Sequence, residues 1–209
     1  MTKKKILLIV LTFNMTLNFC FSQESETPAT DSVKLLIETA KKYKDENEKG
    51  ISKEEKESRI KIREKISSIL DLKEMASLIL KNKWSSLKES EKIQYADLLS
   101  SLVEKIGYPQ IGSYFNKDLK IEYLSESKMP SGDREVGVRI TYPNDEFILS
   151  TKFLLKNKSG NWRIYDVITD GDSLLLIYRN QHMSIIKEKG FQELLKLMRK
   201  KLNSADTKK

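Results

Sequence analysis

Asn161-Trp162-Arg163-Ile164-Tyr165-Asp166-Val167-Ile168-Thr169-Asp170-Gly171-Asp172-Ser173-Leu174 joins the strand-like part of this chain to its helical end. The stretch follows a Ser159-Gly160 turn, and its composition predicts a strand that leaves through Gly171 into a helix. Beyond it, apolar side chains recur at helical spacing, at Leu176, Tyr178, Met183 and Ile186. We therefore expect a sheet to meet a helix at this point of the chain.

Three earlier segments alternate apolar and polar residues with a period of two, which is typical of half-buried strands. They cover residues 119–123, 136–142 and 147–155. Turn-forming residues separate them at 129–133 and 143–145, and a third turn at 157–160 leads into the opening stretch. Four strands joined by short turns predict an antiparallel meander.

The rest of the chain has helical periodicity. A helix is expected from a cap at Thr30 or Asp31, and one or two more from Arg59 to residue 79. The clearest covers 91–106 and should end at Gly107 and Pro109, before a short helix at 110–115. After the sheet, Asp172 or Ser173 caps a helix to about 188, and a last helix follows Gly190. The predicted fold is α+β: N-terminal helices, a curved four-stranded antiparallel sheet and two C-terminal helices, resembling a nuclear-transport-factor-like half-barrel with an apolar pocket.

The first residues predict export. Lys3, Lys4 and Lys5 precede an apolar run at 6–13 that is too short to span a membrane, and a Phe21-Ser22 site follows. We expect a signal peptide at 1–22, cleaved near Ser22, then a flexible lead at 23–31, one domain at 32–202 and a polar tail at 203–209. Cys20, the only cysteine, leaves acylation as a lipoprotein open.

Charge and composition limit the function classes. The net charge of +8 fits anionic membranes, nucleic acid or a plain solvated surface, and export argues against nucleic acid. Catalytic groups are few: His182 is the only histidine, caps and turns explain Asp170 and Asp172, and Asp166 is expected to bond to nearby backbone donors. We therefore expect no catalytic residue, no metal site and no cofactor.

The side chains expected to face inward are apolar. They are Met75, Leu98, Leu102, Val138, Ile140, Phe147, Leu149, Phe153 and Ile164. Alternating apolar strands occur in any ordinary sheet, so this set is compatible with a filled core and also with a hollow one.

Several motifs together resemble a known family. They are Leu70-Asp71-Leu72-x-Glu74-Met75-Ala76, Trp84-x-x-Leu87, Glu91-Lys92 leading to Tyr95, Tyr114, Trp162-x-x-Tyr165-Asp166-Val167, Asp170-Gly171-x-Ser173-Leu174 and Tyr178-Arg179-x-Gln181. Their order and spacing, over about residues 69–202, resemble the MlaC (toluene-tolerance) family of periplasmic phospholipid-binding proteins.

The resemblance implies a monomeric periplasmic carrier that shuttles phospholipid between the outer and inner membranes. Its partners would be an inner-membrane ABC transporter with an MCE-domain subunit and an outer-membrane lipoprotein complex, and phospholipid would be cargo rather than cofactor. Exposing two acyl chains of roughly 30 CH₂ groups, at ~0.8 kcal/mol each, would cost on the order of 20 kcal/mol. A carrier must therefore be hollow, and the inward-facing set, with Leu174 and Tyr178, would contact the lipid.

Two other functions stay open from the residues alone. The first is an enzyme in a half-barrel of the nuclear-transport-factor type, which would need His182 and Asp166 for its chemistry. The second is a structural or adhesion protein tethered to a membrane through an acylated Cys20.

Overall fold

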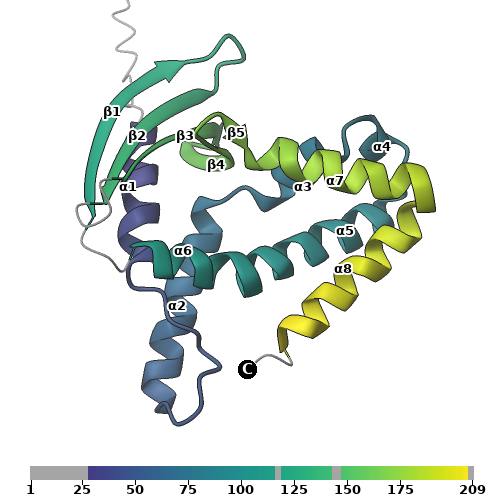
Figure 1. Ribbon diagram of the computed structural model, residues 1–209, viewed down its shortest axis with the longest axis horizontal. Helices are drawn as coiled ribbons and strands as arrows, with labels where there is room; N and C mark the ends of the chain where they lie inside the picture. The colour runs from purple at the N-terminus through teal and green to yellow at the C-terminus, as the bar shows by residue number, and fades with distance from the viewer. Residues whose placement is uncertain (1–27, 116–118, 143–146, 207–209) are drawn as a thin grey trace, which may run out of the picture.

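The computed structural model describes residues 28–115, 119–142 and 147–206, and these form an α+β fold (Figure 1). The helices are α1 (Ala29–Ala40), α2 (Lys53–Ile69), α3 (Leu72–Leu80), α4 (Asn82–Ser85), α5 (Glu89–Leu102), the π-helix η1 (Val103–Gly107), α6 (Tyr108–Phe115), α7 (Leu174–Lys189) and α8 (Phe191–Asp206). The predicted signal peptide, Cys20 and the 143–145 turn lie outside the described residues. The α+β class is confirmed.

The sheet is open and antiparallel, with its strands in sequence order. Its strands are β1 (Lys120–Lys128), β2 (Arg134–Tyr142), β3 (Phe147–Lys158), β4 (Asn161–Thr169) and β5 (Asp172–Ser173). One face is buried along β2 at Val136, Val138, Ile140 and Tyr142, as the alternation predicts. The Ser159-Gly160 turn is confirmed, with positive φ angles of 53° and 85° that suit a two-residue hairpin.

The sheet holds five strands rather than the four expected. Asp170 and Gly171 both have positive φ, 48° and 93°, and form a second tight hairpin instead of leading directly into a helix. This turn pairs Thr169 with Asp172 and Ile168 with Ser173. The chain then enters α7, and the Ser173 hydroxyl caps it by accepting a hydrogen bond from the Leu176 backbone N–H at 3.0 Å.

The N-terminal helices begin earlier than their sequences suggest. Helix α1 starts at the fully buried Ala29, and Thr30 does not cap it but donates hydrogen bonds to Glu126 of β1. Helix α2 starts at Lys53, with Ser52 as its cap, rather than at Arg59. Arg59 is buried and pairs with glutamates on the preceding loop and its own helix, so this charged stretch is folded back onto α2.

The long helix does not end at Gly107 and Pro109. It widens into η1 and continues as α6, so that α5, η1 and α6 form one bent rod beneath the sheet (Figure 1). Pro109 has no N–H to donate to the preceding turn, so the hydrogen-bond ladder is interrupted there, directly after the wider turn of η1. Tyr108, fully buried, anchors the junction through a 3.0 Å hydrogen bond between its hydroxyl and that of Ser67.

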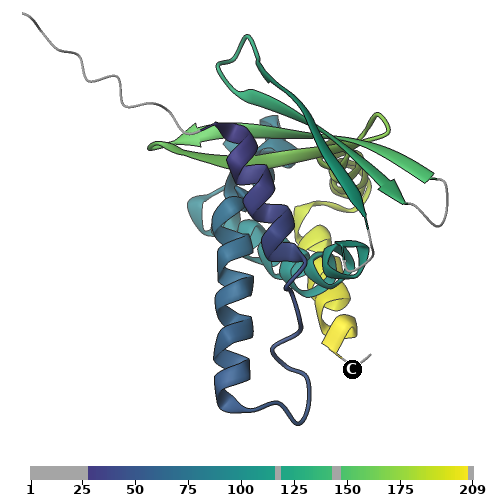
Figure 2. The same cartoon turned by 90° about the vertical axis from the view of Figure 1, so that its left-hand side faces the viewer.

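Two groups of buried apolar residues support the fold. The sheet cluster joins α1 and the end of α2 to the inner face of β2–β4, and α1 lies across that face in Figure 2. The helical cluster joins α3, α5, α7 and α8. Partly buried Leu70 and Val103 pack against both clusters. In the described part of the chain, no helix is long and apolar enough to span a membrane.

Candidate functional site

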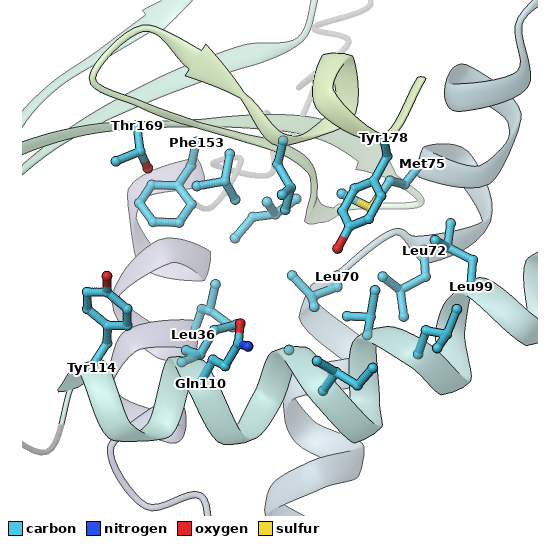
Figure 3. A pocket seen from close by; sticks show the side chains of 18 of the residues that line it. Leu36, Leu70, Leu72, Met75, Leu99, Gln110, Tyr114, Phe153, Thr169 and Tyr178 are labelled. Atoms are coloured by element: carbon cyan, nitrogen blue, oxygen red, sulfur yellow. The ribbon is translucent and has the colours of Figure 1, made fainter. Parts of the chain in front are cut away.

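A cavity of about 530 Å³ lies between the two clusters. Figure 3 shows its two walls, with the sheet and α7 on one side and the α5–η1–α6 rod on the other. Its size falls within the roughly 300–1,000 Å³ range of small-molecule sites in proteins. The core of this domain is therefore hollow rather than filled.

The sheet end of the cavity is formed by the inner face of the strands, α1 and α6. Leu149 lies opposite Ile140 in the β2–β3 register, and Phe153 lies opposite Val167 in the next pair. Leu36 of α1 and Tyr114 of α6 close this end from below (Figure 3). Because side chains alternate along a strand, every second residue of these strands faces the cavity side of the sheet.

The structure brings most of the sequence-predicted site residues together. Those that line the cavity are Met75, Leu102, Ile140, Leu149, Phe153, Ile164, Leu174 and Tyr178. Their positions agree with a binding role, and contact with a lipid stays a prediction.

Three predicted residues do not line the cavity. Leu98 packs within the helical cluster, while Leu99, one position on, faces the cavity instead. Val138 is on the correct face of β2 but is only 1% exposed within the sheet cluster, where α1 lies against β2. Phe147, also on the correct face, lies at the strand end beyond the helical cover and is 49% exposed.

Sequence reasoning missed most of the lining supplied by helices. These residues include Leu36, Leu72, Leu99, Val103, Ile111, Ile185 and Met198. Helical periodicity identifies such apolar faces, but it does not tell which part of a face meets empty space. The cavity also has polar lining residues that the predicted set did not include, namely Gln110, Thr151, Thr169, Gln181, His182 and Lys201.

The single histidine lies in the wall of the cavity and is hydrogen-bonded. His182 is 6% exposed, and its Nδ1 lies 2.7 Å from the Tyr95 hydroxyl. Burial and then the nearby Lys201 ammonium lower the pKa of His182 to about 4, so the ring is neutral at pH 7. Burial raises the pKa of Tyr95, which keeps its hydroxyl protonated.

Two of the carboxylates in the 166–172 segment, Asp166 and Asp170, have structural partners. Asp166 is buried and accepts hydrogen bonds from the Ser173 hydroxyl at 2.6 Å and from the backbone N–H of Val167 and Leu175. Asp170 accepts one from the backbone N–H of Ser150. Among the described residues no group of three potential metal ligands occurs. His182 and Asp166 thus have separate partners and form no nucleophile–base pair with each other.

The family model for the MlaC protein matches residues 35–200 of this chain. The chain belongs to the MlaC family. The match begins within α1 and ends within α8, and it includes every residue that lines the cavity except Lys201.

Solved structures support the same fold for this MlaC-family chain. A phospholipid-binding protein from Ralstonia solanacearum, solved in complex with a phospholipid, is similar with a TM-score of 0.64. The two sequences are 18% identical, and the similarity covers 87% of this chain and 98% of that one. No curated protein matches the chain in sequence.

A motif shared by the MlaC resemblance has a visible structural purpose here. Arg179, in the Tyr178-Arg179-x-Gln181 motif, donates two hydrogen bonds, of 3.2 and 2.9 Å, to the backbone carbonyl of Leu78 at the end of α3. This contact holds α7 against α3, and the cavity lies along the opposite side of α7, where Tyr178 and Gln181 project. The motif thus orients the helix that carries the polar wall.

Proposed function

We propose that this protein is a phospholipid carrier whose cavity holds the acyl chains of one lipid. The observation that carries the proposal is a cavity of about 530 Å³ that runs between the sheet and helical clusters and has mostly apolar walls. Membership of the MlaC family supports it, and so does the phospholipid in the complex of the Ralstonia solanacearum protein.

Energetics favour an enclosed site over a surface groove. Exposing the acyl chains of one phospholipid to water costs on the order of 20 kcal/mol of free energy, at ~0.8 kcal/mol for each CH₂. A binding protein must therefore replace most of the bilayer contacts. The lining from Leu36 at one end to Met198 at the other offers such contacts along the whole cavity.

The proposed setting is the periplasm, reached through a signal peptide at 1–22. There the protein would move lipid between the outer and inner membranes as a monomer. An MCE-type ABC transporter and an outer-membrane lipoprotein complex are the proposed partners. Family membership supports this setting. Without the three lysines of residues 1–22 the net charge falls from +8 to +5, which is still suited to anionic membrane surfaces.

The test is to purify the protein without detergent, extract it with solvent and analyse the extract by mass spectrometry. We expect about one phospholipid per protein molecule. Leu149→Trp, which places a large side chain in the cavity, should reduce that amount several-fold. Ile148→Trp is the matched control, because Ile148 is adjacent on β3 but points to the other face and is 56% exposed.

Both variants should keep the thermal unfolding temperature within a few degrees of the unsubstituted protein, since neither removes a core side chain. A protein free of lipid in every preparation, including one exposed to phospholipid vesicles, would contradict the carrier function. Equal lipid content in the two variants would instead show that the lipid lies outside this cavity.

A further inference from the structure

One wall of the cavity carries a row of polar side chains. Tyr178, Gln181 and His182 line it from α7, and Lys201 lines it from α8. The α7 residues are three and four positions apart, so they lie on the same face of the helix. The Tyr178 hydroxyl points into the open space in Figure 3. We name this set of four residues the α7–α8 corner.

Lys201 is the only Lys or Arg among the described residues that line the cavity. Within the described part of the chain its ammonium forms no ion pair, and Gln181 and the Tyr178 hydroxyl likewise have no hydrogen-bond partner there. Lys201 and Gln181 are both exposed, so this corner opens to water. A positive charge and several unused donors therefore meet at one opening of a cavity whose remaining walls are mostly apolar and carry no charge among the described residues.

The sheet end has different chemistry. Its lining there consists mainly of apolar and aromatic side chains, with Thr151, Thr169 and Gln110 as polar members, and carries no charged group among the described residues. An anionic group would lose its hydration at that end and would gain only neutral partners such as the buried Thr151 hydroxyl, with no cation to offset its charge. At the α7–α8 corner it keeps contact with water and gains a cation.

We propose that the α7–α8 corner binds the phosphate of the bound phospholipid, with the acyl chains extending from it toward the sheet. Lys201 supplies the positive charge, and the Gln181 amide and the Tyr178 hydroxyl donate hydrogen bonds to the phosphate oxygens. The group esterified beyond the phosphate then faces solvent. This assignment deepens the carrier function and rests on it.

His182 is a built-in reporter for this site. It is the only histidine in the chain, so it gives a single set of imidazole NMR signals. The groups that face its ring are Tyr95, Tyr178 and the Lys201 ammonium. A phosphate bound to Lys201 offsets that positive charge and favours the imidazolium form. The pKa of His182 should therefore rise when the phosphate is bound.

The experiment compares Lys201→Gln with Lys200→Gln in delipidated full-length protein. Both variants lose one positive charge from exposed neighbouring positions of α8, but only Lys201 lines the cavity. The probes are dioleoyl phosphatidylglycerol, dioleoylglycerol, which has the same chains and no phosphate, and inorganic phosphate. Dissociation constants are measured for each probe, and the His182 pKa is followed by NMR.

We expect Lys201→Gln to weaken phosphatidylglycerol binding about tenfold, the effect of one charge-assisted hydrogen bond. Dioleoylglycerol binding should change less than twofold, and Lys200→Gln should leave both unchanged. Phosphatidylglycerol should raise the His182 pKa in the unsubstituted protein, whereas dioleoylglycerol should not. Inorganic phosphate alone should bind weakly, because it lacks the chains that fill the cavity.

The possible failures are distinguishable. If the unsubstituted protein binds neither lipid, the carrier function itself fails. If phosphatidylglycerol binds with the same affinity to both variants and leaves the His182 pKa unmoved, the carrier stands and the α7–α8 corner is not the phosphate site. Inorganic phosphate that binds as tightly as phosphatidylglycerol would overturn the assignment to a lipid head group.

Discussion

The two ends of the cavity are built by different kinds of structure. At the sheet end, strand alternation places Ile140, Leu149 and Phe153 on one face, and hydrogen bonds of the ladder satisfy the backbone. At the helical end, side-chain contacts hold the wall: Asp166 and Ser173 fix the start of α7, and Tyr95 bonds to His182. The sheet thus supplies most of the apolar wall of the cavity, and α7 and α8 supply a wall that carries polar side chains.

The ends also differ in how they meet solvent. Aromatic rings border the sheet end, where Tyr142 lies with ring centroids 6.5 Å from Tyr114 and 5.8 Å from Phe147. Tyr114 and Phe147 are 57% and 49% exposed. At the helical end the exposed lining residues include Gln181 and Lys201. One cavity therefore presents an aromatic border and a cationic one, which suits a molecule with an apolar and an anionic part.

The largest expected effect comes from placing a carboxylate at each end in turn. Leu149→Asp puts an unpaired charge against the apolar sheet end and should weaken phospholipid binding about a hundredfold. Leu197→Asp is the matched change at the helical end, where Leu197 is 36% exposed and four residues before Lys201. Water solvates the new carboxylate there, and the loss should be about tenfold, because the carboxylate pairs with Lys201 and competes with the phosphate for its charge.

Lipid titration measures both affinities, with circular dichroism to check that each variant is folded. Equal losses in the two variants would remove the distinction between the ends.

The second effect concerns pH and the buried His182. Its pKa is about 4 in the folded protein against about 6.5 in the unfolded chain, so the unfolded state binds a proton first as the pH falls. The free energy of unfolding is therefore unaffected by this ring above pH 6.5, and it falls as the pH drops from about 6.5 to 4. We expect the free energy of unfolding to fall by about 2 kcal/mol over this interval, allowing for partial solvent screening of the ring.

Chemical denaturation at several pH values measures this difference. His182→Asn retains a polar atom near the Tyr95 hydroxyl and should flatten the pH dependence in that interval. An unchanged slope in the variant would show that carboxylates, and not this ring, control the acid sensitivity of the helical end.

The smallest expected effect tests how α7 is fixed. Ser173→Ala removes the hydroxyl that caps α7 and that donates to Asp166, and should cost about 1 kcal/mol of stability. For a domain of this size that corresponds to a fall of roughly 2–4 °C in the melting temperature. Ser184→Ala, at an exposed site on the same helix whose hydroxyl bonds only to Glu188, is the control and should change little. A similar fall in both would argue against a special importance of the cap.

Strand residues of the cavity were predictable because an extended chain alternates its side chains between two faces. Once Ile140, Leu149, Phe153 and Ile164 are assigned to strands, their common direction follows. The exceptions have local causes. Val138 is covered where α1 lies against the strand, and Phe147 extends past the helices at the strand end. Neither position is set by the residues that flank it in the sequence.

Helical lining was harder to predict because a helix presents a broad apolar face that several neighbours share. Leu98 and Leu99 differ by one position in an unbroken apolar series, yet only Leu99 faces the cavity. The π-helix η1 adds a further change of phase, which rotates the following residues relative to a regular helix. Such a change is not encoded in a simple period.

Residue patterning alone determined the α+β class, the inner face of the sheet, the turn at Ser159-Gly160 and a helix cap at Asp172 or Ser173, of which the structure selects Ser173. These depend on interactions within a few residues, namely strand alternation, positive φ angles and a side-chain hydroxyl near the first turn of a helix. Only the tertiary structure decided that the interior is hollow and that Lys201 meets Gln181 and His182 at one opening. Both depend on how far apart distant elements settle when they pack, which no local pattern specifies.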